Sequence, residues 1–222
     1  MFPNRSLMKA VPLRPRPSVM ARRAALALAS TIGAVTLCAL AALPVAAAQA
    51  ATTTACPSAT LVQPFLSYGD QNYYRLVPGG SFEGSTTGWS FSGGAKVASK
   101  GEPSTVGGSL GADSLELPAG ASAQSPFTCV EPNERKFRFF AHSEGSTATI
   151  LVSVVYESSL GNITLPIRQL ALKSAWEPSP ILQTGAPVAT AISGGVAHLA
   201  LRFTSVSGTA RIDDVYLDPR MR

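Results

Sequence analysis

The chain has 222 residues, with 18 Lys and Arg, 13 Asp and Glu, and a net charge of +5. Six of the basic residues and none of the acidic ones fall within residues 1–50, which leaves 12 basic against 13 acidic residues in 51–222. Such a near-neutral remainder lacks the basic stripe that neutralises phosphates, so the composition excludes a nucleic-acid-binding protein. Its length predicts one domain.

Residues 1–50 have the pattern of a secretory signal peptide. Arg22 and Arg23 precede an uncharged apolar run, residues 24–46, and a small-residue A-x-A end places the cleavage site after Ala50. The run is also long enough to span a bilayer, so an uncleaved membrane anchor is the alternative. The sequence therefore predicts a secreted or cell-envelope protein, which would contact a membrane only through an uncleaved leader.

Two cysteines, Cys56 and Cys129, remain once the leader is removed. An even number of cysteines in an exported chain predicts a disulfide, with two unpaired buried thiols as the alternative. The bridge would close a loop of about 74 residues, for which the chain-entropy account gives roughly 4 kcal/mol as an upper figure. It would tie an N-terminal arm, residues 51–71, to a domain at 72–219.

Much of the mature chain alternates apolar and polar residues with the period of a β-strand. In 147–156, for example, Ile150, Val152 and Val154 share one side, and the other side is also partly apolar, as in a central strand. Gly-, Ser- and Pro-rich turn signals separate the segments, and no amphipathic helix pattern exceeds two turns. Many short strands between turns predict an all-β sandwich or barrel. The predicted strands are 113–119, 136–142, 147–156, 196–204 and 210–218.

Two segments near the ends of the domain carry a recognisable pattern. "LVPGGSFEGSTTGWSFSGGAKVAS" (76–99) contains G-S-F-E and G-W motifs, and "GTARIDDVYLDP" (208–219) contains an I-D-D-V-x-L strand. Together they resemble the carbohydrate-binding modules of the family 4/9/22 type, which have a galactose-binding-like fold. The resemblance implies a jelly-roll β-sandwich. The mature chain also resembles small exported proteins of high-GC bacteria that have no assigned activity.

The same resemblance implies a structural calcium. In such modules an acid after the opening Phe and an acid of the terminal pair hold the ion, which here would be Glu83 with Asp213 or Asp214. Calcium takes about six to eight oxygen ligands, and carboxylates with backbone carbonyls suit it. The alternative needs no metal: one aspartate is solvated and the other pairs with Arg211, Arg202 or a backbone N–H.

The jelly-roll resemblance also implies a concave sheet face on which a sugar would bind. Tyr156 ends a predicted strand that would line this face, and Arg138, Phe140 and Gln169 complete the predicted ligand-binding set. The alternative is that these four are ordinary residues of a sheet surface.

No combination of residues predicts catalysis. The sequence has two histidines, His142 and His198, both in predicted strands, and neither is accompanied by a G-x-S-x-G elbow. Linear sequence pairs no carboxylates for glycoside hydrolysis, and the glycine pairs lack the context of a phosphate-binding loop. We therefore predict a protein without enzymatic activity.

Two functions remain, and different surface features favour each. The first is non-catalytic binding of a polysaccharide or cell-envelope glycan by a monomer, which an exposed aromatic pair on the concave sheet would favour. The second is a structural or protein-interaction module of the envelope without a sugar site. A Thr- and Ser-covered sheet with an apolar patch elsewhere would favour the second.

Overall fold

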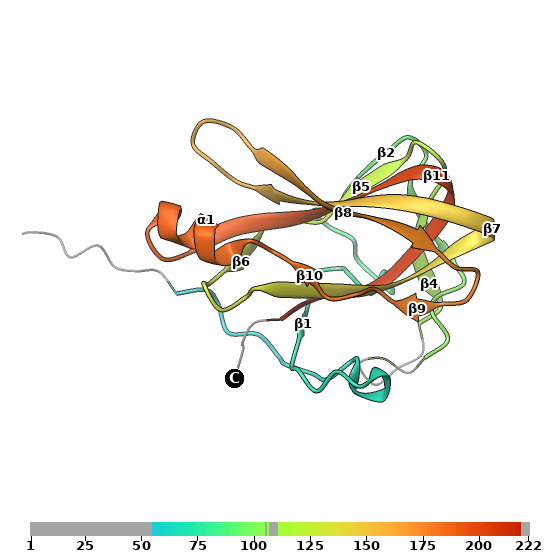
Figure 1. Ribbon diagram of the computed structural model, residues 1–222, viewed down its shortest axis with the longest axis horizontal. Coiled ribbons are helices and arrows are strands. Elements are labelled where there is room, and N and C mark those ends of the chain that lie inside the picture. The colour runs from blue at the N-terminus through green and yellow to red at the C-terminus, as the bar shows by residue number, and fades with distance from the viewer. Residues whose placement is uncertain (1–54, 105, 107–110, 219–222) are drawn as a thin grey trace, which may run out of the picture. The chain divides into compact units, whose positions relative to one another are not determined.

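The computed structural model describes residues 55–104, 106 and 111–218, all of which belong to one compact unit. The predicted signal peptide lies outside these residues. Within them the chain is all-β, with eleven strands, one short α-helix and one 3-10 turn (Figure 1). The first six strands are β1 (Arg75–Leu76), β2 (Ser90–Ser92), β3 (Lys96–Ser99), β4 (Asp113–Leu117), β5 (Ser122–Gln124) and β6 (Thr128–Val130). The other strands are β7 (Lys136–Tyr156), β8 (Ile163–Leu172), β9 (Glu177–Pro178), β10 (Leu182–Gln183) and β11 (Ala197–Asp218), and the helical elements are η1 (Leu66–Tyr68) and α1 (Ala186–Ser193).

The strands form a jelly-roll β-sandwich, and two long strands run through both of its layers. β7 pairs antiparallel with β11, from Tyr156 opposite Leu199 to Lys136 opposite Asp218. The first half of β7 and the second half of β11 lie in one layer, here called the first layer, with β1, β3, β4, β9 and β10. Their other halves lie in the second layer with β2, β5, β6 and β8. Figure 1 shows the two layers one above the other, with β7 bending between them.

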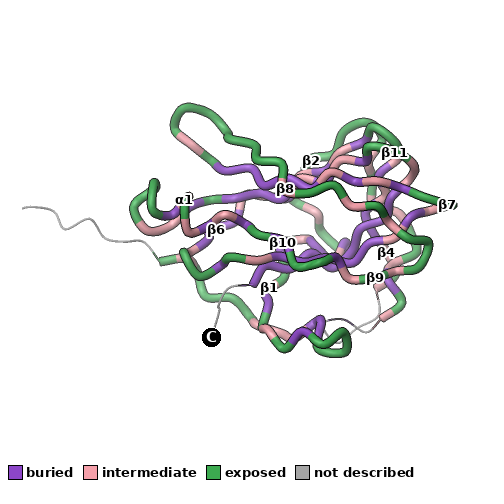
Figure 2. The backbone as a smooth tube through the Cα atoms, in the orientation of Figure 1, coloured by how far each residue is buried: buried purple, intermediate pink, exposed green. Residues whose placement is uncertain are grey.

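The hydrophobic core lies between the layers because alternate side chains of each strand point inward. Ile150, Val152 and Val154 are buried there, as their spacing in the sequence predicts. Phe139 of the first layer meets Phe203 of the second, with ring centroids 4.9 Å apart and ring planes at 76°. Figure 2 shows that buried segments follow β7 and β11, where the two layers face each other.

The bend in the long strands differs from the sequence prediction. Residues 143–146 were expected to be a turn between two strands, but β7 continues through them, with Gly145 at a φ of 109°. β11 likewise joins the predicted strands 196–204 and 210–218. Its register shifts near Gly208, where a Cβ would collide with the carbonyl of Thr147. Glycine therefore lets each strand fold over from one layer to the other without ending.

The N-terminal arm packs against the outer side of the first layer (Figure 1). Phe65 is fully buried, stacks on Phe140 with ring centroids 5.3 Å apart, and meets Tyr74 edge-on. The predicted disulfide is formed and joins Cys56 to Cys129. The arm therefore covers a sheet face that would otherwise be open to solvent.

Helix α1 connects β10 to β11 and has only two turns. Pro187 stands in its first turn, and Gly194 ends it in the left-handed conformation, with a φ of 84°. In the part of the chain that the structure describes, no helix is long and apolar enough to cross a membrane.

Candidate functional site

The outer side of the second layer carries a set of polar side chains, here called the polar face. Cross-strand partners lie side by side on one face of a sheet, so strand pairing identifies the neighbours. In one row across the layer, Arg202 of β11 lies between Gln124 of β5 and Ser153 of β7, and Ser90 of β2 lies beyond Gln124. The intervening residues of β11, such as Leu201, point into the core.

A second row of the polar face runs parallel to the first, one step along the strands. It has Thr204 at its centre, Ser122 and Ser92 on one side, and Leu151 and Gln169 on the other. Four of these five side chains are polar, so hydroxyl and amide groups cross the layer from β2 to β8. Gln169, one of the four predicted ligand-binding residues, is exposed on this face.

A groove of about 170 Å³ opens on the polar face where β2, β5 and β11 lie together. The hydroxyls of Ser92 and Ser122 are 2.8 Å apart and hydrogen-bonded across it. Arg202 donates from Nε and Nη2 to Oε1 of Gln124, at 3.0 and 2.6 Å. The groove is lined by Ser90, Phe91, Ser92, Ser122, Gln124 and Arg202.

Three of the four predicted ligand-binding residues lie away from this groove. Tyr156 faces the core side of its strand, and its hydroxyl donates to the Thr184 carbonyl. Burial raises the pKa of this phenol to about 12. Arg138 and Phe140 are buried beneath the N-terminal arm. The four residues therefore do not share one accessible face.

Arg138 has a structural environment. Its Nη1 donates to Asp70 at 2.9 Å, its Nε and Nη2 donate to the Ser179 carbonyl, and its guanidinium lies 4.5 Å from the centre of the Phe65 ring. A buried cation needs such partners, and here the arm supplies the carboxylate. Strand alternation alone could not have revealed that the arm would cover this residue.

The aromatic side chains near the polar face are few. Trp89 is buried, and its indole N–H donates to the Pro78 carbonyl at 2.8 Å. Phe91 stacks beside it, with ring centroids 6.4 Å apart, and is 37% exposed. Phe91 is opposite Ala123, a core residue, so its ring lies on the core side of β2 and not among the serine hydroxyls of the polar face.

The adjacent aspartates near the end of β11 sit at a β-bulge. The register of β11 against β7 shifts between Asp213 and Tyr216, and Asp214 has a left-handed φ of 49°. Both aspartates are buried, and Asp213 lies opposite the buried Phe140 and against the segment that carries Glu102. Neither ion pair predicted for them forms, since Arg211 pairs instead with glutamates of β4 and β7.

Glu83 approaches the same place from the opening segment. The Asp113 N–H donates to Glu83 Oε1 at 2.7 Å, and the Glu102 N–H donates to Asp213 Oδ2 at 3.0 Å. A Cβ on Gly111 would lie 2.7 Å from Glu83 Oε1 and 3.7 Å from Asp213 Oδ2. The two carboxylates predicted from the resemblance therefore border the same small space.

No described cation pairs with the buried carboxylates of Asp213, Asp214 and Glu102. Burial raises the pKa of Asp213 to about 8 and that of Asp214 to about 7, and repulsion between neighbouring carboxylates adds to the effect. Glu102 is 1% exposed, burial raises its pKa as well, and its Oε1 has no hydrogen-bond partner among the residues that the structure describes. These carboxylates are hard oxygen ligands, which calcium prefers, and the Glu102 oxygen without a described partner is available to bind an ion. In the described residues, however, no three His, Cys, Asp or Glu side chains form a metal-holding group by themselves.

A second hollow, here called the apolar pocket, lies between the β7–β8 hairpin and α1 and measures about 560 Å³. Its walls include Tyr156, Ile163, Leu165, Val188 and Ile192. The last four of these side chains are exposed in the described chain. Figure 2 shows the exposed hairpin reaching out beside α1. The pocket is separate from the polar groove and has an aliphatic character.

The two histidines are not brought together. His142 packs its ring 4.4 Å from that of Trp176, while His198 lies on β11 with its Nδ1 3.4 Å from Glu157. Burial lowers the pKa of His142. Within the described residues, neither imidazole is hydrogen-bonded to a hydroxyl or thiol nucleophile.

No protein-family model matches the chain, and no curated protein matches it either. Several solved structures are similar to it. The CBM22-1–GH10 modules of the Clostridium thermocellum endo-1,4-β-D-xylanase 10B, complexed with xylohexaose, show 19% identity and a TM-score of 0.47 over 63% of this chain, which spans 27% of that structure. The CBM22-1 xylan-binding domain from Paenibacillus barcinonensis shows 16% identity and a TM-score of 0.44, over 64% of this chain and 93% of that one.

A family 11 carbohydrate-binding module from Clostridium thermocellum, complexed with a β-1,3-1,4-mixed-linked tetrasaccharide, shows 14% identity and a TM-score of 0.39. The match covers 64% of this chain and 94% of the family 11 module. All three structures contain carbohydrate-binding modules, two of them of family 22 and one of family 11.

Proposed function

We propose that this protein is an exported, monomeric module that binds a polysaccharide or cell-envelope glycan and has no catalytic activity. The observation that carries the proposal is the groove on the polar face. It combines serine hydroxyls, a glutamine amide and a guanidinium on one exposed sheet face. Sugars are bound by groups of these kinds, because their hydroxyls need hydrogen-bond partners.

Export fits the covalent structure. A disulfide between residues 73 positions apart is typical of proteins that fold in an oxidising compartment. Together with the leader pattern of residues 1–50, it supports a location outside the cytoplasm.

Retention on insoluble polysaccharides tests the proposed function. The protein is mixed with a panel of plant and bacterial cell-wall polymers, and the bound fraction is measured. We expect retention on at least one polymer, and loss of at least tenfold in affinity when Arg202 and Gln124 are both changed to Ala. Arg168→Ala is the matched control, since Arg168 is exposed on β8 opposite Val152, a core residue, and is not part of the polar face. Absence of retention on every polymer contradicts the proposal.

The apolar pocket favours a second candidate, a protein-interaction module of the envelope. Exposed aliphatic side chains are gathered there, whereas the polar face is covered by hydroxyl, amide and guanidinium groups. A charge placed in the pocket, Ile192→Asp, separates the two candidates. If protein interaction is the function, the variant loses its association with isolated envelope fractions while its retention on polysaccharide stays absent or unchanged.

We also propose that calcium stabilises the fold. Glu83, Asp213 and Asp214, with backbone carbonyl oxygens, would hold it, and Glu102 would contribute the oxygen that has no partner. The ion would neutralise carboxylates that burial otherwise makes costly. Its predicted role is structural, because the cluster joins the bulge of β11 to the segments that precede β2 and β4 and lies in a different part of the sheet from the polar groove. The stability of the unaltered protein and of Asp213→Asn, each measured with calcium and with chelator, tests this proposal.

A further inference from the structure

We propose that the polar groove recognises an acidic sugar, a residue that carries a carboxylate, within the glycan. This inference rests on the proposed function and specifies its ligand class. The feature that carries it is the state of Arg202, the cation at the centre of the polar face.

Arg202 is held in place without being neutralised. Of the four arginines that are at least partly buried in the described chain, three form ion pairs with carboxylates, whereas Arg202 contacts an amide. An amide oxygen orients a guanidinium but leaves its positive charge uncompensated. The three paired arginines are Arg75 with Glu134, Arg138 with Asp70, and Arg211 with Glu116 and Glu144.

The hydrogen bonds of the groove leave an excess of donors. A guanidinium has five N–H groups and accepts none, so Gln124 must turn its oxygen toward Arg202. That oxygen takes two of the five, and the amide N–H groups of Gln124 are left for another partner. A ligand that complements this arrangement brings acceptors, and a carboxylate accepts two parallel N–H bonds from an arginine fork.

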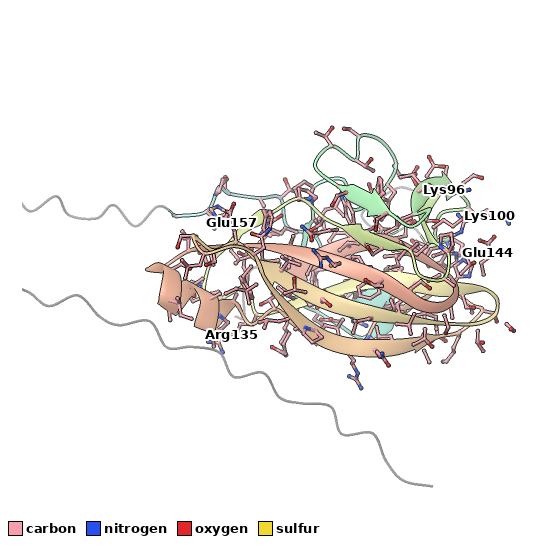
Figure 3. All side chains as sticks on the ribbon, turned by 90° about the horizontal axis from the view of Figure 1, so that it is seen from above. Lys96, Lys100, Arg135, Glu144 and Glu157 are labelled. Carbon is pink, nitrogen blue, oxygen red and sulfur yellow. A yellow bond between two sulfur atoms is a disulfide. The ribbon has the colours of Figure 1, made fainter. Side chains whose placement is uncertain are left out.

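No carboxylate of the polar face competes for Arg202 in the described chain. The two rows around Arg202 and Thr204 contain no acidic residue. The acid nearest along the strands is Glu157 just beyond the end of β7, which pairs with His198, about 13 Å from Arg202 by the rise of four strand residues. In Figure 3, Glu157 and Glu144 lie toward opposite ends of the molecule, and Glu144 lies beside Lys100.

The surrounding side chains suit the rest of a sugar ring. Ser90, Ser92 and Ser122 place hydroxyls around the guanidinium. At about 170 Å³ the groove is smaller than a pocket that encloses a drug-sized ligand, about 300 to 1,000 Å³. It therefore fits one residue or branch of a chain that otherwise lies along the exposed face.

The test compares each uronic-acid polymer with its own neutral form. Glucuronoxylan, polygalacturonate and alginate are each carboxyl-reduced, which converts the acid to an alcohol and leaves the backbone unchanged. Affinities of the protein for both forms are measured at low and moderate salt. We expect at least one acidic polymer to bind at least tenfold more tightly than its reduced form, with affinity falling as salt rises.

Variants then assign the preference to the groove. Arg202→Gln should remove the difference between acidic and reduced polymers, and Arg202→Lys should restore only part of it, because a lysine keeps the charge without the fork. Arg168→Gln, the matched loss of an exposed arginine, should leave the preference intact. Circular dichroism and the thermal midpoint verify that each variant is folded, and the salt dependence of the unaltered protein provides a readout that needs no variant.

Equal affinity for acidic and reduced polymers would overturn the inference and leave the proposed function standing. A preference that persists in Arg202→Gln would also overturn it, since the groove would not be its source. Equally tight binding of dextran sulfate would show a general polyanion site and contradict the assignment to a carboxylate. Failure to bind any polymer, acidic or neutral, would overturn both this inference and the proposed function.

Discussion

Replacing Asp213 by Asn should reveal what its burial costs the fold. Burial raises the pKa of Asp213 from 3.8 to about 8, so the folded protein binds a proton that the unfolded chain releases between these values. In metal-free protein the stability is therefore unaffected by this group below pH 3.8 and falls as pH rises, until the folded state also ionises near pH 8. At about 1.4 kcal/mol per pH unit, burial of the Asp213 carboxylate lowers the free energy of unfolding at pH 7.5 by at most about 5 kcal/mol.

Asparagine keeps the shape of the aspartate and has no charge to bury, but it retains only one of the two oxygens that accept N–H bonds from Glu102 and Asp214, which costs about 1 to 3 kcal/mol. With chelator at pH 7.5, we expect Asp213→Asn to raise the free energy of unfolding by about 2 to 4 kcal/mol, and at pH 4 to lower it by no more than the cost of the lost hydrogen bond. With millimolar calcium, the unaltered protein should gain stability and the variant should not. Urea denaturation at the two pH values, with chelator and with calcium, measures all of these quantities.

The matched control is Asp113→Asn, which makes the same chemical change at a neighbouring, half-buried position. It should shift stability by no more than about 0.5 kcal/mol at either pH. If Asp213→Asn destabilises the chelated protein equally at both pH values, the argument from burial is wrong. If calcium stabilises neither protein, the calcium proposal is wrong, whatever the pH dependence.

Three further predictions concern stability. Changing Cys56 and Cys129 to Ser should lower the free energy of unfolding by up to about 4 kcal/mol, and a reductant should weaken the unaltered protein but not the variant in urea titrations. Phe139→Ala should cost about 3 to 5 kcal/mol because it empties the space between the layers, whereas Phe91→Ala, at a partly exposed edge position, should cost about 1 to 2 kcal/mol; equal urea midpoints would refute the core assignment. Arg138→Ala should cost about 3 kcal/mol, since the buried Asp70 loses its cation and keeps only neutral donors from Asn72 and Tyr74. It should leave the polymer affinity of the folded protein unchanged, and a selective loss of affinity would show that Arg138 belongs to the binding site.

Local pattern was enough to predict the strands, because alternation reports which side of a strand is buried. The spacing of Ile150, Val152 and Val154 places them in the core, and the structure confirms it. The merging of two predicted strands into β7 was not predictable in the same way. Residues 143–146 have the composition of a turn, and whether a glycine there ends a strand or bends it depends on the layer that packs against it.

The candidate site was harder to predict because accessibility depends on distant segments. Arg138 and Phe140 belong to a strand whose outer side is covered by an arm more than 60 residues earlier in the chain. Arg202 carried a usable signal, since it lies on the polar side of the predicted strand 196–204. What the sequence could not reveal is that its neighbour across the sheet would be Gln124 and not a carboxylate.

The position of β11 in the chain has a consequence for synthesis. β1, β4, β5, β6 and β7 all pair with β11 and all precede it. A nascent chain that ends before Ala197 therefore lacks the strand that links both layers. Its earlier strands remain incompletely paired until β11 is available. Contacts between distant residues make such folding slow. A truncation before Ala197 should yield an aggregation-prone product and not a smaller version of the domain.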